Sequence, residues 1–160
     1  MSKAVLISIR PEWCEKIMTG QKTIEVRKTR PKMNPPVKCY IYKCGNGKVI
    51  GEFVCDDIFE RIVQVGTSCE TPKYCLCDWN MDCTPLDGLI ADACLTKEAL
   101  EKYLDGGVGY GWHISNLKIY DHPRDLWEFN AVPNEVEEAF GVKPKPITRP
   151  PQSWRYVAEV

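Results

Sequence analysis

Apolar and polar positions in the first third of the chain form a pattern that predicts one helix among four strands. Residues 3–9 (KAVLISI) make a run that suits a largely buried strand. Pro11 is expected to open a helix, because proline at a first helical position costs no hydrogen bond, and Gly20 is expected to end it. Three further strand-like runs follow, at residues 22–28, 37–43 and 48–57.

The pattern is less regular in the rest of the chain. Residues 65–84 mix turn-forming residues with four cysteines, which indicates a long loop or insertion. Thr96 and Asn134 are each expected to cap a helix. Further strands are expected at residues 110–115, 117–120 and 153–159. The order of elements predicts a single α+β domain over residues 1–160, with a Cys-rich loop or insertion at about 65–95 and a sheet curled into a small β-barrel with flanking helices.

Length and composition favour one domain in a reducing compartment. The chain has 160 residues, 44% hydrophobic and 27% charged, which is enough for one sizeable core and short for two. No run approaches the roughly 18 apolar residues of a membrane span, and Arg10 and Glu12 interrupt any export signal. We therefore expect a soluble, cytoplasmic protein with no membrane partner. In that compartment, free thiols or a metal site are favoured over disulfides for the nine cysteines.

The net charge of −1 conceals an uneven distribution along the chain. Residues 1–48 hold eleven Lys or Arg against three acids, residues 49–142 hold six against eighteen, and residues 143–160 hold four against one. A segment with so many cations must display most of them, so the first third predicts a basic patch. A solvated basic edge, balanced by acids nearby in space, is the alternative.

The stretch GQKTIEVRKTRP, residues 20–31, surrounds one carboxylate with cations. Alternation along this expected strand places Glu25 and Arg27 on one face and Ile24 and Val26 on the other. The apolar pair is expected to hold the strand to the core, which leaves the polar side chains to face a cleft. Lys22 and Arg27 then offer charge to a phosphate. Glu25 either orients Arg27 or accepts a hydrogen bond from the amino edge of a base.

Two parts of the chain resemble the ASCH family of small barrels in the PUA-like superfamily. The first is ISIRPEWCEKIMTGQKTIEVRKTRP, which contains the family's G-x-K-T-x-E-x-R pattern; the second is GYGWHISNLKIYDHPRDLWEF together with RPPQSW. The resemblance covers most of the chain except residues 65–95. It implies a β-barrel with a cleft beside the first helix and a role in binding RNA or nucleotides. The expected binding residues are Arg10, Lys22, Thr23, Glu25, Arg27, Tyr110 and Trp112.

Aromatic residues could add a stacking surface to this cleft. Tyr110 and Trp112 fall on one face of an expected strand, which is the arrangement that binds unpaired bases. Trp112 is equally well explained as a core residue. A protein-binding adaptor, supported only by the acidic middle section, is a further alternative to a nucleic-acid binder.

A nucleic-acid-directed hydrolase is the main alternative function. Some small ASCH proteins resemble amidohydrolases of an acetylated cytidine that use a lysine, a threonine nucleophile and a glutamate. Lys22 matches the lysine, but the nucleophile's position holds Glu25. Thr23 is not expected to replace the missing nucleophile, because a shift of one residue along a strand reverses the side-chain direction. A ribonuclease needs a base, an acid and a cation, which Lys22, Glu25 and His113 could supply if they meet. A lone histidine is more often structural than catalytic.

Four cysteines in the middle of the chain define a candidate metal site. Cys69, Cys75, Cys77 and Cys83 spell C-x5-C-x-C-x5-C, and four thiolates complete a structural zinc shell. The spacing lacks the strong C-x-x-C pairs, so four reduced thiols are the alternative. No other cofactor is expected.

Overall fold

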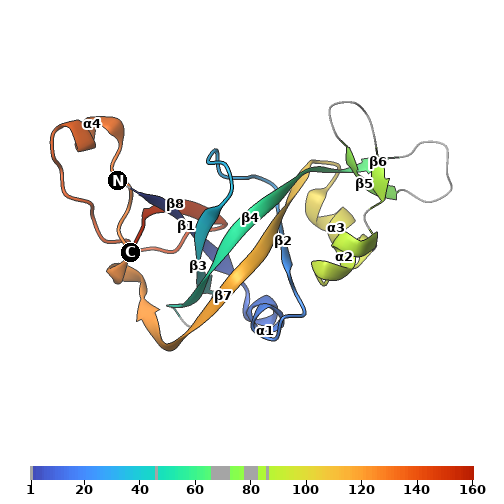
Figure 1. Cartoon of the computed structure of the whole chain (residues 1–160), viewed down its shortest axis with the longest axis horizontal. Helices are drawn as coiled ribbons and strands as arrows, with labels where there is room; N and C mark the ends of the chain where they lie inside the picture. The colour runs from blue at the N-terminus through green and yellow to red at the C-terminus, as the bar shows by residue number, and fades with distance from the viewer. Residues whose placement is uncertain (1, 46, 66–72, 78–82, 86) are drawn as a thin grey trace.

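One mixed sheet organises the protein (Figure 1). The computed structural model describes residues 2–45, 47–65, 73–77, 83–85 and 87–160, with side chains described outside residues 60–87. Six strands follow the order β2-β7-β4-β3-β1-β8, and β5 and β6 extend the sheet from β4. All pairs are antiparallel except β1 with β3. The strands are β1 Lys3–Ile9, β2 Ile24–Arg27, β3 Val37–Lys43, β4 Lys48–Val65, β5 Lys73–Cys77, β6 Cys83–Pro85, β7 Gly109–Asp125 and β8 Trp154–Ala158.

Short helices surround this sheet. The described residues form α1 Pro11–Met18, α2 Asp87–Asp92, α3 Lys97–Leu104, α4 Glu135–Ala139 and the 3-10 helix η1 Leu126–Glu128. The predicted caps are confirmed: Thr96 Oγ1 accepts from the Ala99 N–H, and the Asn134 side chain accepts from the Glu137 N–H. Within the described part of the chain, no helix has the length and apolarity to cross a membrane. The predicted α+β class is confirmed.

The two long strands β4 and β7 give the sheet its curvature. Their pairing is interrupted by four register shifts, and such bulges increase strand twist and bend the sheet. Gly51 lies at one of these shifts, where an added Cβ would lie 2.5 Å from the carbonyl oxygen of Lys118. Asn116, with φ 48°, falls within β7, so the two strands expected on either side of it are one continuous strand.

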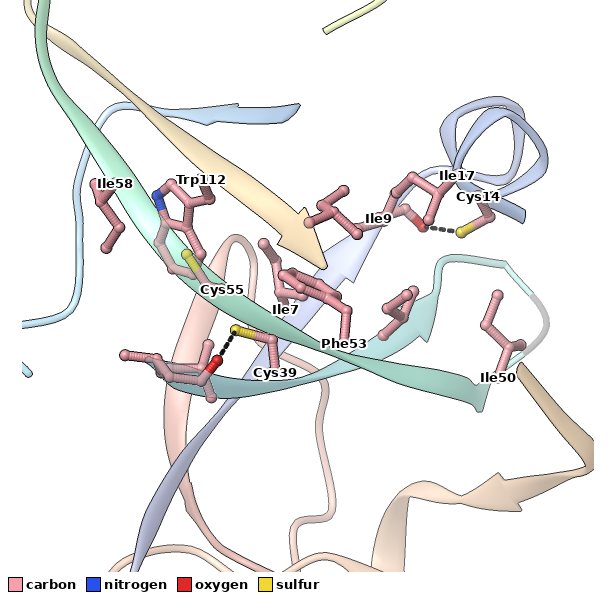
Figure 2. Close-up of a cluster of buried hydrophobic side chains, with 14 residues drawn as sticks. Ile7, Ile9, Cys14, Ile17, Cys39, Ile50, Phe53, Cys55, Ile58 and Trp112 are labelled. Carbon is pink, nitrogen blue, oxygen red and sulfur yellow. Dashed lines mark hydrogen bonds between the residues drawn. The ribbon is translucent and has the colours of Figure 1, made fainter. Parts of the chain in front are cut away.

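The inner face of the curled sheet carries the main core (Figure 2). β1 contributes Val5, Ile7 and Ile9 to it, and α1 covers one end through Cys14 and Ile17. The other buried members come from β3, β4 and β7 and include Cys39, Ile41, Phe53, Cys55, Ile58, Trp112 and Ile114. Because α1 directly follows β1, the helix stays against the strand that precedes it.

Two smaller clusters cover the outer face. Ile24 and Val26 of β2 pack with Leu89, Ile90, Leu100 and other residues of α2 and α3. Ala4, Leu6 and Tyr40 pack with the C-terminal Phe129, Ile147 and Val157. β2 is therefore sandwiched, with α2 and α3 against its apolar side and the interior of the curled sheet on its polar side.

Side chains connect the two edge strands of the sheet. Trp154 Nε1, on β8, donates to Thr29 Oγ1 just after β2 at 2.9 Å, and the Lys32 N–H donates to the Tyr156 hydroxyl at 2.7 Å. Among the described residues, no backbone ladder joins β2 to β8. The sheet is thus curled until its edges touch through side chains, and closure into a barrel stays a prediction.

The middle of the chain is more ordered than a long loop. It contains β5, which pairs with the end of β4 from Ile62↔Leu76 to Val65↔Lys73, followed by β6 and α2. These elements lie within the Cys-rich loop or insertion expected at about residues 65–95, and its status as an insertion stays a prediction. The segment KYCLC pairs as a strand with the extended end of β4.

Candidate functional site

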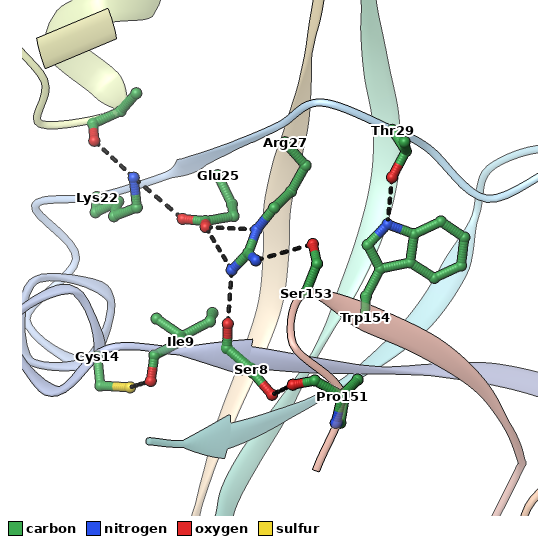
Figure 3. Close-up of polar contacts among 11 residues, drawn as sticks. Ser8, Ile9, Cys14, Lys22, Glu25, Arg27, Thr29, Pro151, Ser153 and Trp154 are labelled. Atoms are coloured by element: carbon green, nitrogen blue, oxygen red, sulfur yellow. Dashed lines mark hydrogen bonds and ion pairs between the residues drawn. The ribbon is translucent and has the colours of Figure 1, made fainter. Parts of the chain in front are cut away.

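A carboxylate held between two cations lies inside the curled sheet (Figure 3). Glu25 Oε2 is 3.2 Å from Lys22 Nζ, and Glu25 Oε1 is 2.8 Å from Arg27 Nη2 and 2.9 Å from Arg27 Nε. The side chains of Lys22 and Glu25 are 3% and 8% exposed, and that of Arg27 is 11% exposed. We call these three residues the charge network.

The alternation of β2 explains how this network forms. Glu25 pairs with Trp112 and Arg27 with Tyr110 across the β2–β7 ladder, and directly paired residues project from the same face of a sheet. Ile24 and Val26 project from the opposite face onto α2 and α3. The predicted alternation is thus confirmed, but the polar face lies against the interior of the sheet instead of opening to solvent.

Lys22 is fixed by three interactions. Its ammonium donates to the Ala93 carbonyl at the end of α2 at 2.6 Å, pairs with Glu25, and lies 5.2 Å from the centroid of the Trp13 ring. The ammonium therefore has two oxygen partners and one aromatic ring around it. The side chain of Lys22 is thus buried and paired in this structure, and its expected contact with a phosphate stays a prediction.

Arg27 joins β2 to two other parts of the fold. Its Nη2 donates to the Ser8 carbonyl of β1 at 2.7 Å, and its Nη1 donates to Ser153 Oγ at 3.2 Å. Ser8 in turn donates its hydroxyl to the Pro151 carbonyl at 2.6 Å. The guanidinium therefore ties one edge of the sheet to the segment that enters the other edge.

The remaining predicted binding residues are not equivalent. Arg10 is exposed and lies just before α1, where its side chain makes no capping hydrogen bond. Thr23 is half-buried, and its N–H donates to the Asp92 carbonyl. Tyr110 is half-buried against the main core, whereas Trp112 is 0% exposed. Trp112 therefore offers no open stacking face in this structure, and its ring is part of the main core.

The structure does not bring together the three residues that a ribonuclease was expected to use. His113 pairs with Ile24 across the ladder, so it projects from the face opposite Glu25. Its Nδ1 lies 2.6 Å from Asp56 Oδ1. That hydrogen bond, together with the charge of the imidazole when protonated, lowers the pKa of the exposed Asp56 carboxyl. Lys22 and Glu25 meet, but His113 is separated from them by the sheet.

The four candidate zinc ligands all lie in the part of the chain whose side chains are not described. Cys69 lies outside the described residues. Cys75 and Cys77 lie on β5 and Cys83 on β6, with Cys77 opposite Cys83 in the ladder, but their side chains belong to the part that is not described. Among the side chains that are described, no group of three metal-ligating residues comes together. Zinc at the four cysteines therefore stays a prediction.

Buried thiols form a separate group in the core. Burial raises the pKa of Cys14 and of Cys55 to about 12, and it also raises the pKa of Cys39. Cys14 donates to the Ile9 carbonyl and Cys55 to the Asp57 carbonyl. These cysteines stay protonated at neutral pH, which makes them core residues with low nucleophilicity.

Sequence reasoning missed several partners of the charge network. Trp13, Ser8 and Ser153 all contact it, yet none was among the expected site residues. Ser8 did carry a signal, since it is the one hydroxyl within the apolar strand LISI. A polar group inside a buried strand needs a hydrogen-bond partner, and here its carbonyl and its hydroxyl both have one.

Comparison with known proteins agrees with this architecture. A family model described as the ASCH domain matches residues 7–151. The crystal structure of ASCH from Zymomonas mobilis is similar, with a TM-score of 0.61 and 18% identity over 98% of this chain and 88% of that one. A mutant of that protein gives a TM-score of 0.62 and 18% identity over 99% and 92% of the two chains. At this identity the likeness shows a shared fold. No curated protein gives a significant sequence match.

Proposed function

Because the chain belongs to the ASCH domain family, we propose that it binds RNA or a modified nucleotide at the surface around α1 and the segment that follows β2. The observation that carries the proposal is the excess of positive over negative residues in residues 10–32, several of which are exposed outside the charge network. Residues 10–32 contain seven Lys or Arg and three Glu, and one of these acids, Glu25, is already shared by Lys22 and Arg27 inside the sheet.

Exposed cations flank the buried network in the chain. Arg10 follows two residues after Ser8, whose carbonyl accepts from Arg27. Lys28 and Lys32 are exposed and lie on the segment that Thr29 ties to Trp154. Exposed Lys and Arg keep their charge available for phosphates, and phosphate contacts supply most of the sequence-independent affinity for nucleic acid. We name Arg10, Lys28 and Lys32 the cationic rim.

The charge network has a supporting role in this proposal. A buried and hydrogen-bonded guanidinium holds neighbouring backbone in place, so Arg27 fixes the position of β1 just before Arg10 and of the segment that enters β8. Lys22 does the same for the end of α2. We therefore propose that phosphate is contacted by the cationic rim, and that Lys22 and Arg27 support the rim from inside the sheet.

A hydrolase is not the function that the geometry supports best. The expected base, acid and cation are divided between the two faces of the sheet, with His113 next to Asp56 and Glu25 next to Lys22. General acid–base catalysis requires its groups to reach one substrate atom or its direct neighbours. We therefore base the proposal on binding.

Salt dependence of binding to a labelled single-stranded RNA tests the proposal. Replacement of Arg10, Lys28 or Lys32 by Ala should weaken binding and flatten the slope of log affinity against log salt by about 0.7 for each phosphate that the variant no longer neutralises. Lys143→Ala is the matched control, because Lys143 is exposed and follows α4, a helix that lies far from α1 in Figure 1. Equal slopes in all four variants, or no RNA binding by the wild-type protein, would refute the proposal.

A further inference from the structure

A single indole N–H stands out among the buried polar groups. Trp112 is 0% exposed, and its Nε1 is the buried side-chain nitrogen or oxygen that has no hydrogen-bond partner in the described part of the structure. Figure 2 shows this nitrogen at the edge of the ring that faces away from Phe53 and towards the side of Ile58. A buried donor without an acceptor destabilises a fold, so its presence calls for an acceptor beyond those that the described residues supply.

The surroundings of Trp112 connect it to the proposed binding surface. It pairs with Glu25 on one side and with Ile58 on the other, so it lies directly beside the charge network. Its ring makes an edge contact with Trp154, with centroids 5.6 Å apart, and Trp154 makes another with Tyr156 at 5.4 Å. Trp154 and Tyr156 are half-buried and hold the segment that carries Lys32. A row of aromatic rings thus leads from the cationic rim to the unpaired N–H.

The chemistry of this row specifies the ligand. An indole N–H and a guanidinium can only donate hydrogen bonds, and both oxygens of Glu25 are already in use. The ligand atom that reaches Trp112 must therefore be an acceptor. Aromatic side chains favour a planar ring as the body of the ligand. A nucleobase with an exocyclic carbonyl oxygen, such as uracil, combines these properties with an acceptor that projects beyond the ring, whereas the acceptors of adenine are nitrogens within its rings.

We propose that Trp112 Nε1–H is a specificity-determining donor that binds the carbonyl oxygen of a nucleobase, and this inference rests on the proposed function. Because Trp112 is covered in the free protein, the base reaches it when Trp154 turns aside. Trp154 is half-buried, its indole donates one hydrogen bond to Thr29, and its ring contacts Trp112 and Tyr156, so entry of the base exchanges these contacts for its own. The base would then take over the ring contact that Trp154 makes with Trp112.

Trp112→Phe tests the inference, because phenylalanine keeps a ring and removes the donor. Uridine 5′-monophosphate and adenosine 5′-monophosphate are the probes, and affinity is measured by titration calorimetry for the wild type and the variant. We expect the variant to lose about tenfold in affinity for the uridine nucleotide, the effect of one hydrogen bond to a buried group, and to bind the adenosine nucleotide as the wild type does. Its melting temperature should be lower, because the smaller ring leaves a cavity in the main core, so both affinities are measured well below the melting temperature of the variant.

A nuclear magnetic resonance experiment observes the same donor directly. The indole resonance that disappears in Trp112→Phe is assigned to Trp112, and we expect the uridine nucleotide to shift it and slow its hydrogen exchange in the wild type. Equal uridine affinity in the two proteins would overturn the inference. An indole resonance that is already protected from exchange and does not shift would also overturn it, because the N–H would then be bonded to a resident water or to another group of the chain. The salt slope for RNA depends on the cationic rim, so it tests the proposed function separately and should be the same in Trp112→Phe.

Discussion

The Glu25 carboxylate binds the Arg27 guanidinium through two donors, with Nε and Nη2 at 2.9 and 2.8 Å from the same oxygen. The two residues are neighbours on one face of β2, so the strand itself sets their distance. Because Lys22 occupies the second oxygen, the pattern G-x-K-T-x-E-x-R describes an internal charge network in this chain. The conspicuous cations of the motif thus stabilise the strand on which they lie.

Removing the negative charge from this network should destabilise the protein. Glu25→Gln leaves Lys22 and Arg27 buried without a counter-charge, and breaking a buried ion pair in this way costs about 3–5 kcal/mol. We expect a free energy of unfolding lowered by about 3 kcal/mol in urea titrations. Glu101→Gln is the control, since Glu101 is exposed on α3 and its change should stay within about 0.5 kcal/mol. A Glu25 variant as stable as this control would show that the network is not structural.

Arg27 is predicted to be irreplaceable by lysine. A lysine at this position could still pair with Glu25, but it lacks the planar fork that reaches the Ser8 carbonyl and Ser153 together. We expect Arg27→Lys to lower stability by about 2 kcal/mol, because hydrogen bonds from charged groups contribute more than neutral ones. Amide hydrogen exchange should speed up at β2 and β8, the two edges that Arg27 connects. Arg155→Lys, an exposed change on β8, should leave exchange at β2 unaltered.

Much of the fold could be predicted from periodicity, because period and capping are local properties. The alternation of β2, the opening of α1 at Pro11 and the caps at Thr96 and Asn134 all follow from neighbouring residues. Which face of β2 turns to solvent does not follow from them. That depends on the curl of the sheet and on α2 and α3, which cover Ile24 and Val26 from a distant part of the sequence.

The same limit applies to the site. The sequence placed Lys22, Glu25 and His113 as candidates, and only the β2–β7 register shows that His113 lies opposite Ile24. The partners Ser8 and Ser153 are 145 residues apart in number, and they meet because β1 pairs with β8, so their hydrogen bonds to Arg27 depend on sheet topology. Local patterns identify the charges of a site, whereas the pairing of distant strands decides which of them meet.

Gly51 is predicted to be intolerant of any side chain. A Cβ at this position would lie 2.5 Å from the Lys118 carbonyl oxygen and 3.1 Å from the Ile119 Cα, and both are backbone atoms of the paired strand β7. We expect Gly51→Ala to lower the free energy of unfolding by about 3 kcal/mol, at the upper end of overpacking costs, because the ladder must separate locally. Urea titrations measure this change.

Gly88 supplies the control for that substitution. It lies in α2, and an added Cβ there has nothing within 4 Å, so Gly88→Ala should raise stability by about 0.5–1 kcal/mol through its helix propensity. Two glycines with the same substitution are thus predicted to change stability in opposite directions. Equal effects at both positions would mean that the close approach of β4 and β7 at Gly51 is absent in solution.

The buried thiols predict a loss of stability in alkali. Burial raises the pKa of Cys14 and Cys55 from 9.0 to about 12 in the folded protein. Between these values an unfolded thiol ionises while the folded one stays protonated. The contribution of each thiol is therefore complete below about pH 9 and is lost as the pH rises towards 12. Between pH 8 and pH 10, each thiol should lower the free energy of unfolding by about 1.4 kcal/mol, which corresponds to one pKa unit.

The double variant Cys14→Ala, Cys55→Ala isolates this effect. Its stability at pH 8 should be lower than that of the wild type, because two small cavities replace the thiols. Its decrease between pH 8 and pH 10 should be smaller by about 3 kcal/mol, since two ionisations of the unfolded chain are removed. Urea titrations at both pH values give the two decreases, and Cys44→Ala, at a half-buried position, controls for the loss of one thiol. The free energy of unfolding should decrease less in the double variant, because all other ionisable groups are common to both proteins. Equal decreases would show that Cys14 and Cys55 ionise as readily in the folded state as in the unfolded chain.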